Sequence, residues 1–443
     1  MTSDNTETVE IALIGMGTVG TAVARVLLQE PHRMDRRSGS TLHLKRIVVN
    51  DIGKARNVEV PSGLMTDRID DVLEDPDITL AIQLIGGLSP AKELMMALLD
   101  AGKDIVTANK ALLADEGMEL FSHARQRGRT IAFEGAVAGG IPIVNAMLQG
   151  LAANEITQFS AILNGTSNFI LTEMAVCEQE YAAVLKRAQD EGYAEADPAL
   201  DINGTDAAQK LGILSQLAFG IKWNSEVIFR QGIESIELTD LQFADEFGYT
   251  VKSLAVARRS ASSSGGPSQV LELYVAPTLV PHNNPLARVS GAYNAVRVEG
   301  DLVGDTLYYG QGAGAKPTAS AVLADVIETV TGRAGVTFPQ LLCTEYGENI
   351  RLLNPEQSRS RFYFRFMVED RPGVLGDIAG VLGEHDISIA SVIQPEFCGP
   401  SRNQAVPLVI MTHIVRTGDV MEALKRIDQL AVIHEPSRSM RVM

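Results

Sequence analysis

The first 135 residues alternate between short apolar runs and longer amphipathic stretches. Runs rich in β-branched residues predict buried strands at residues 9–15, 43–51, 78–86, 104–109 and 130–137. The stretches between them, such as residues 18–28 and 90–101, carry apolar side chains at helical spacing. Buried strands that alternate with helices of this length are typical of a doubly wound parallel sheet. We therefore predict an α/β domain over residues 1–135.

A different pattern begins after residue 135. Long helical stretches are followed by alternating apolar and polar positions, which predict strands at residues 270–280 and 294–304. A polar segment at residues 260–268 predicts a loop between two strands rather than a domain boundary, because strand patterns resume on both sides. Residues 136–310 are therefore predicted to form a second, α+β domain.

The helix predicted at residues 312–332 begins with a glycine-rich turn. We expect it to pack on the first domain, which residues 311–335 would complete. A polar run at residues 354–360 indicates a boundary, so residues 336–360 are interpreted as a connection. Residues 361–443 then show the order βαββαβ, which is typical of a ferredoxin-like domain. Its six elements are predicted at residues 361–369, 372–384, 387–394, 406–415, 419–429 and 431–435.

The composition is that of a globular protein, and it excludes some classes of binding partner. Of the 443 residues, 55 are acidic and 38 basic, and the net charge of −17 argues against nucleic acid and anionic membranes. Cys177, Cys343 and Cys398 lie far apart, so neither a disulfide framework nor a zinc site is expected. The polar start and the lack of a long apolar run predict a cytoplasmic protein without a membrane span.

A glycine motif connects the first predicted strand to the first predicted helix. The segment IGMGTVG has the G-x-G-x-x-G spacing, which allows a tight turn, close approach to a pyrophosphate, and packing of helix on strand. This context predicts a Rossmann-type dinucleotide site. Its residues are Gly15, Met16, Gly17, Thr18, Val19 and Gly20.

The end of the second predicted strand bears on the choice of cofactor. Asn50 and Asp51 lie there and are expected to face the ribose. An acidic residue favours a free 2′-hydroxyl, whereas Lys54 and Arg56 could hold a 2′-phosphate. Both NAD and NADP therefore remain possible cofactors.

Thr107, Asn109 and Lys110 lie at the carboxyl end of the strand predicted at residues 104–109, where open α/β sheets bind ligands. Lys110 could equally be a solvated residue at the start of a helix. The loop at residues 135–144 contains three glycines and a proline. It suits either ligand contact or a packed crossover.

Two opposite charges occupy the apolar face of another predicted helix. Asp206 and Lys210 lie one turn apart on that face, and Glu195, Asp197 and Asp201 precede them. A structural ion pair would leave the upstream carboxylates unexplained, and burying such a pair adds little stability. We therefore interpret the carboxylates as a site for an ammonium-bearing substrate and Lys210 as a proton carrier.

The longer motifs resemble one family over the whole chain. They are GMGTVG, TANKALLA, EGAVAGGIPI, LNGTSNFIL, GYAEADPALDINGTDAAQKLGIL and GQGAGAKPTASAV. Together they resemble monofunctional homoserine dehydrogenases that end in an ACT domain, and VEDRPGVLGDIAGVLGEHDISIASVIQ resembles that ACT domain. The resemblance implies reduction of L-aspartate 4-semialdehyde to L-homoserine by NADH or NADPH, on the route to threonine, methionine and isoleucine.

The resemblance also implies roles for individual residues. The lysine matching Lys210 donates the proton, and the one matching Lys110 binds cofactor and substrate. Residues matching Glu195, Asp201 and Asp206 face the amino acid or orient the catalytic lysine. Further cofactor contacts match Gly86, Gly87, Ala108 and Gly314.

Two more expectations concern ions and cofactor preference. The side chain of Glu134 and the carbonyls of Val137, Gly139 and Ile141 match a monovalent cation site, usually sodium. Family members often carry arginine where this chain has Asn50, which weakens the expectation of a strong preference for NADP.

ACT domains commonly bind amino acids between paired copies, so we expect threonine as an effector and a homodimer or homotetramer. A purely dimerising ACT domain is the alternative.

Two other functions fit parts of the sequence. A sensor of nucleotides and amino acids without chemistry would need no proton carrier, and the lysine and carboxylate cluster argues against it. An oxidoreductase that acylates a cysteine would need a thiol just past a strand of the nucleotide domain. None of the three cysteines lies there.

Overall fold

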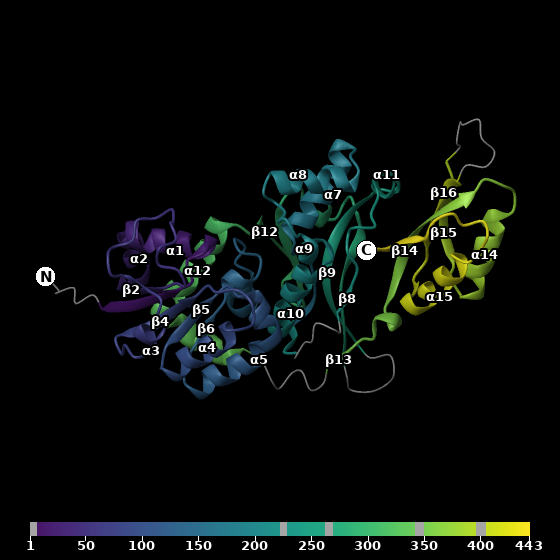
Figure 1. Cartoon of the computed structure of the whole chain (residues 1–443). Coiled ribbons are helices and arrows are strands. Elements are labelled where there is room, and N and C mark those ends of the chain that lie inside the picture. The colour runs from purple at the N-terminus through teal and green to yellow at the C-terminus, as the bar shows by residue number, and fades with distance from the viewer. Residues whose placement is uncertain (1–6, 222–227, 262–268, 342–349, 396–404) are drawn as a thin grey trace. The chain divides into compact units, whose positions relative to one another are not determined.

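The computed structural model describes residues 7–221, 228–261, 269–341, 350–395 and 405–443 (Figure 1). The chain divides into two compact units, each made of three segments. The first comprises residues 1–157, 209–225 and 294–350, and the second comprises residues 158–208, 226–293 and 351–443. Within the described ranges, no helix combines the length and the apolar character that crossing a membrane requires.

The first unit contains a parallel six-stranded sheet in the order β3-β2-β1-β4-β5-β6. This is the strand order of a dinucleotide-binding doubly wound domain, which confirms the predicted fold class. The strands are β1 (Thr8–Ile14), β2 (Thr41–Val48), β3 (Met65–Thr66), β4 (Ile78–Gln83), β5 (Asp104–Thr107) and β6 (Ile131–Ala132).

Helices bury apolar stripes against this sheet. In α1, Gly20, Val23, Ala24 and Leu27 are buried, and they share one core with β1, β2 and β4. The late helix α12 joins the same core and packs against α1. The larger helices of this unit are α1 (Thr18–Gln29), α2 (Pro31–Ser38), α4 (Ala91–Asp100), α5 (Lys110–Gln126) and α12 (Ala315–Val330).

The remaining elements of the first unit are short, apart from one hairpin. Its strands, β11 (Tyr293–Gly300) and β12 (Gly304–Gln311), replace the single strand predicted at residues 294–304. That prediction was wrong because the backbone reverses at Asp301–Val303, where Val303 N–H donates to Asn154 Oδ1. The short elements are α3 (Asp70–Leu73), η1 (Glu134–Ala136), α6 (Ile143–Asn145), η2 (Ala146–Gly150), α13 (Arg333–Thr337) and η4 (Phe338–Gln340).

The second unit is built on a long mixed sheet with the order β7-β9-β10-β18-β14-β16-β15. Strands β9 and β10 pair over thirteen positions, and most of the polar tip predicted between them lies outside the described residues. The strands are β7 (Ile156–Ile162), β8 (Phe229–Arg230), β9 (Tyr249–Ala261), β10 (Gln269–Pro281), β13 (Ile350–Leu352), β14 (Arg359–Glu369), β15 (Ile389–Ile393), β16 (Ala405–Thr412), β17 (Val415–Arg416) and β18 (Arg438–Val442).

Helices of the second unit pack on this sheet, and α10 extends from the second unit into the first. The helices are α7 (Gly165–Cys177), α8 (Tyr181–Asp190), α9 (Ala199–Ile202), α10 (Thr205–Phe219), α11 (Leu238–Glu246), η3 (Pro285–Arg288), η6 (Pro355–Gln357), α14 (Val374–Glu384) and α15 (Thr417–Ile427).

The C-terminal part has the predicted βαββαβ order, but its last strand is β18 rather than residues 431–435. Within that segment Ile433 forms only an isolated bridge to Val368. Strand β18 forms instead because it pairs on two sides, antiparallel with β14 and parallel with β10. The sheet of the C-terminal domain is therefore continuous with the sheet that precedes it in the chain.

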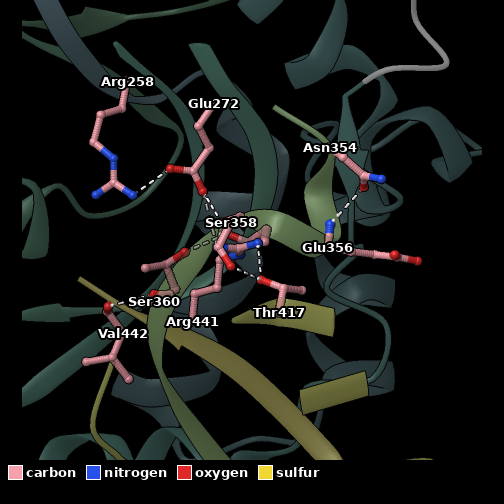
Figure 2. Close-up of polar contacts among 11 residues, drawn as sticks. Arg258, Glu272, Asn354, Glu356, Ser358, Ser360, Thr417, Arg441 and Val442 are labelled. Atoms are coloured by element: carbon pink, nitrogen blue, oxygen red, sulfur yellow. Dashed lines mark hydrogen bonds and ion pairs between the residues drawn. The ribbon is translucent and has the colours of Figure 1, made fainter. Parts of the chain in front are cut away.

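A buried polar cluster fixes this junction (Figure 2). The guanidinium of Arg441 donates to the hydroxyls of Ser358 and Thr417, at 2.8 and 3.2 Å, and pairs with Glu272 at 3.5 Å. Glu272 also pairs with Arg258 at 2.5 Å. Strands β9, β10 and β18, the segment after η6 and the start of α15 thus share one hydrogen-bonded network.

Candidate active site

The glycine turn after β1 has the backbone that a dinucleotide site requires. Gly15 has φ +93°, and a Cβ there would come within 3.0 Å of the Leu84 backbone. A Cβ on Gly20 would lie 2.2 Å from the carbonyl oxygen of Gly15. Helix α1 begins with Gly17 as its N-cap, without a side-chain cap, so its first amides are available to an anion.

A pocket of about 220 Å³ lies beside this turn in the first unit. Its walls come from the segments after β4, β5 and β6, from the turn before α12 and from α10. Predicted site residues in its lining are Val19, Gly86, Ala108, Lys110, Gly139 and Lys210. The pocket therefore brings together six residues from five separate stretches of the sequence.

Other lining residues were given no specific role from the sequence, although Asn109 was predicted to lie with Lys110 at the ligand-binding end of a strand. They are Leu84, Ile85, Asn109, Gly135, Ala136, Ala138, Gly312, Ala313 and Thr318. Most lie within the motifs TANKALLA, EGAVAGGIPI and GQGAGAKPTASAV, so the motif boundaries themselves were a signal that could have identified them.

The predicted cofactor residues outside this lining, apart from Asn50 and Asp51, lie close to it in sequence. Gly87 follows Gly86, and Gly314 is the N-cap of α12 with φ 112°. The remaining residues of the glycine turn flank Val19, namely Gly15, Met16, Gly17, Thr18 and Gly20. Their assignment to the cofactor stays a prediction.

A buried network fixes the loop that carries Lys110. Gln83 accepts a hydrogen bond of 2.7 Å from the hydroxyl of Thr107, and that hydroxyl accepts one of 3.1 Å from Asn109 N–H. The Asn109 amide then donates to the carbonyls of Ile85 and Gly87, at 3.0 and 2.7 Å. The ends of β4 and β5 are thereby tied together directly beneath the pocket.

Asn109 also caps α5, because its side-chain oxygen accepts from Leu112 N–H at 3.2 Å. Lys110 is the first residue of that helix and is half-buried. Its position at the pocket wall is thus set by the cap and by the network under it.

The loop after β6 holds a buried carboxylate. Glu134 is 2% exposed and accepts hydrogen bonds from the backbone of Val144 and Asn145, at 2.9 and 2.8 Å. Burial raises the pKa of Glu134 to about 7, although the two backbone donors lower it. Burial likewise raises the pKa of Asp325, whose carboxylate accepts from Glu134 N–H at 2.9 Å.

The segment after β2 is exposed, and some of its polar groups already form hydrogen bonds with one another. Asp51 accepts hydrogen bonds from the backbone of Gly53 and Lys54, at 2.8 and 3.1 Å. The Arg56 guanidinium donates to the carbonyl oxygens of Asp51 and Lys54. Asn50 is exposed beside them.

Two of the predicted substrate carboxylates meet in the second unit. The Asn164 amide donates to Asp201 at 2.7 Å and to Asp206 at 2.9 Å. Asn164 also caps α7 by accepting from Ser167 N–H at 2.7 Å. The motif LNGTSNFIL by itself assigns no role to Asn164, since an N-cap and a donor to two carboxylates look alike in a sequence.

Asp206 and Lys210 both lie on α10, one turn apart, and are 5% and 7% exposed. Both charged side chains are therefore buried, whereas the roles assigned to them stay predictions. Glu195 is exposed in the segment before α9 and does not join the pair of carboxylates on Asn164.

Three family models match consecutive parts of the chain. The homoserine dehydrogenase NAD-binding domain matches residues 15–134, the homoserine dehydrogenase domain matches residues 142–327, and the ACT domain matches residues 362–432.

Relatives and solved structures match most or nearly all of the chain. Homoserine dehydrogenase of Synechocystis sp. is 39% identical over 98% of this chain and 100% of its own. A homoserine dehydrogenase structure from Thiobacillus denitrificans has TM-score 0.88 and 39% identity, with 99% of each chain covered. A hyperthermophilic archaeal homoserine dehydrogenase mutant in complex with NADPH has TM-score 0.60 and 26% identity, over 72% of this chain and 97% of its own. The chain thus belongs to the homoserine dehydrogenase family of oxidoreductases, in the form that carries an ACT domain.

Proposed function

We propose that the protein reduces L-aspartate 4-semialdehyde to L-homoserine with NADH or NADPH bound at the glycine turn. The observation that carries this proposal is the pocket beside that turn, which two lysines line, one of them almost fully buried. A site that only bound nucleotides would need no such ammonium groups, because the turn itself supplies the phosphate contacts. The two lysines in the pocket therefore also argue against a sensor without catalytic activity.

A reduced nicotinamide cofactor held at the glycine turn would supply a hydride to the aldehyde carbon. Negative charge then develops on the carbonyl oxygen, and the Lys210 ammonium stabilises it and transfers a proton to it, giving the hydroxyl of the product. Lys110, held by Asn109 and its network, orients the aldehyde and the nicotinamide end of the cofactor. Asp206, one turn before Lys210 on α10, orients the lysine.

The carboxylates of the second unit suit recognition of the amino group. We propose that Asp201 and Glu195 face the ammonium of the substrate. The hydrogen bonds from Asn164 to Asp201 and Asp206 support this role, since they fix the direction of both carboxylates without neutralising them.

For the cofactor we propose that both NADH and NADPH are used. Asp51 can accept from a ribose hydroxyl, which supports NADH, although two backbone amides already use one of its oxygens. Arg56 lies on the same loop and supports binding of a 2′-phosphate. Asn50, which carries no charge, removes one strong reason for preferring NADPH.

One assay tests these proposals. Purified protein is mixed with aspartate semialdehyde and either NADH or NADPH, and loss of nicotinamide absorbance is followed with and without L-threonine. We expect turnover with both cofactors and inhibition by threonine through the ACT domain. Absence of turnover with either cofactor would contradict the enzymatic function, whereas unchanged turnover with threonine would indicate a purely dimerising ACT domain.

Light scattering on the same sample tests the proposed homodimer or homotetramer.

We also propose a sodium ion at Glu134, with carbonyls of Val137, Gly139 and Ile141. The donor set fits a hard cation, because the Glu134 carboxylate has more lone pairs than its backbone and side-chain donors use. In the described residues, no cluster of three His, Cys, Asp or Glu side chains could hold a metal ion. A monovalent ion held by one carboxylate and carbonyls is consistent with that finding.

The raised pKa of Glu134 gives this site a pH-dependent test. In the folded state the Glu134 carboxyl group keeps its proton up to about pH 7, whereas in the unfolded state it loses the proton near pH 4.5. The free energy of unfolding therefore falls as the pH rises through this window. The loss is at most about 3 kcal/mol. At pH 8, we expect a higher melting temperature in sodium chloride than in choline chloride of equal ionic strength, and a smaller difference at pH 5.5.

Glu134→Gln is the control, because it removes the charge and keeps the shape. It should abolish the difference between the two salts at pH 8. An equal gain from sodium in this variant would place the ion elsewhere.

A further inference from the structure

A second pocket, of about 380 Å³, lies in the second unit. It is formed by α7, α11, the start of β9 and the segment around η3. Its lining shares no residue with the pocket beside the glycine turn, and it lies outside the segment that matches the ACT domain. No step of the proposed reaction uses it.

Lys252 is the unusual residue of this pocket. It lies on β9, is 2% exposed, and donates hydrogen bonds to the carbonyl oxygen of Val289 at 2.6 Å and to Asn168 Oδ1 at 3.2 Å. Both acceptors are uncharged. In the described part of the chain no carboxylate pairs with this ammonium, and burial lowers the pKa of Lys252 to about 8.

A purely structural role explains the lysine poorly. The carbonyl of Val289 already accepts a hydrogen bond of 3.1 Å from Asn168, which also donates to the carbonyls of Gly291 and Tyr293. Asn168 therefore holds this segment without Lys252. A buried ammonium without a counter-charge costs several kcal/mol, which an anion entering the pocket would offset.

The other lining residues restrict the kind of anion. Glu178 and Asp245 line the same pocket and are exposed, so an anion with two charges would be repelled. Leu171, Leu241 and Val251 give the pocket an apolar wall. One buried cation, two carboxylates nearer to solvent and an apolar wall complement a zwitterion with an apolar side chain.

We propose that this pocket binds a free α-amino acid with an apolar side chain. Its carboxylate would pair with Lys252, its ammonium with Asp245 or Glu178, and its side chain would lie against Leu171 and Leu241. The pocket volume falls in the range of small-molecule sites. This ligand would be bound in addition to the substrate and to any ligand of the ACT domain.

Isothermal titration calorimetry of the full-length protein with L-leucine tests the proposal. We expect binding at a site that L-leucine occupies at least tenfold more tightly than isoamylamine or 4-methylpentanoate, which lack the carboxylate and the amine respectively. Lys252→Met should weaken binding at least tenfold, whereas Lys186→Met, which changes an exposed lysine on α8, should leave it unchanged. Absence of L-leucine binding to the unchanged protein would overturn the proposal.

Two further variants keep the test decisive. Ala175→Trp fills the pocket from an exposed position on α7, so it should block binding even if Lys252→Met folds poorly. Asp370→Ala changes an exposed residue between β14 and α14, inside the segment that matches the ACT domain, and should leave binding unchanged. Loss of binding in Asp370→Ala, with retention in Lys252→Met and Ala175→Trp, would place the amino acid in the ACT domain and overturn the proposal.

Discussion

Replacement of Lys210 by alanine is expected to lower the turnover number by at least about 100-fold, the usual contribution of a positioned general acid. Lys210 lines the pocket together with Lys110 and lies almost fully buried on α10. Removing its ammonium leaves the developing oxyanion without a proton and without a charge partner. Affinity for the cofactor should change little, because the glycine turn and the loops after β4 and β5 remain. Steady-state kinetics and fluorescence titration with NADPH measure the two effects separately.

A second variant tests whether Lys210 transfers a proton or contributes only its positive charge. Lys210→Arg keeps the positive charge, but a guanidinium cannot give up its proton near neutral pH, so this variant should be nearly as inactive as Lys210→Ala. Lys186→Ala is the matched control on an exposed helix surface. Full turnover in Lys210→Arg would show that the lysine acts as a charge alone, and full turnover in Lys210→Ala would remove it from the mechanism.

The second large effect concerns stability. Arg365 on β14 is 3% exposed, and it pairs with the fully buried Asp240 of α11 at 2.7 Å and with Glu237 at 2.8 Å. Tyr363 also donates to Asp240, at 3.0 Å. Arg365→Met leaves the Asp240 carboxylate buried without its cation, which should destabilise the second unit by about 3–5 kcal/mol. Urea unfolding followed by circular dichroism measures the loss as a shift of the midpoint.

Two comparisons distinguish the cost of a buried Asp240 carboxylate without its cation from the cost of lost side-chain packing. Arg371→Met breaks an exposed pair with Glu369 and should cost less than about 1 kcal/mol. The double variant Arg365→Met/Asp240→Asn removes the buried carboxylate that lacks a cation, and it should recover part of the lost free energy of unfolding. If Arg365→Met is no more costly than Arg371→Met, the buried pair does not hold α11 to β14.

Much of the fold could be predicted from local pattern. Strands β1, β4 and β5 are largely apolar because most of their positions are buried on both faces, and the spacing from Gly15 to Gly20 follows from a contact within a single turn. The last strand could not be predicted in the same way. Residues 431–435 are as strand-like as Arg438–Val442, but only the latter find partners on both sides, in β10 and β14.

The sequence by itself determined the family motifs, the buried face that carries Asp206 and Lys210, and the position of the glycine turn, since each depends on residues close together in the chain. The tertiary structure decided which distant residues share a pocket, and it gave roles to Gln83 and Asn164 that no spacing indicates. It also decided that Lys252 is buried between neutral acceptors. The physical reason is that hydrogen-bond partners and burial depend on contacts between residues that are 20 to more than 100 positions apart.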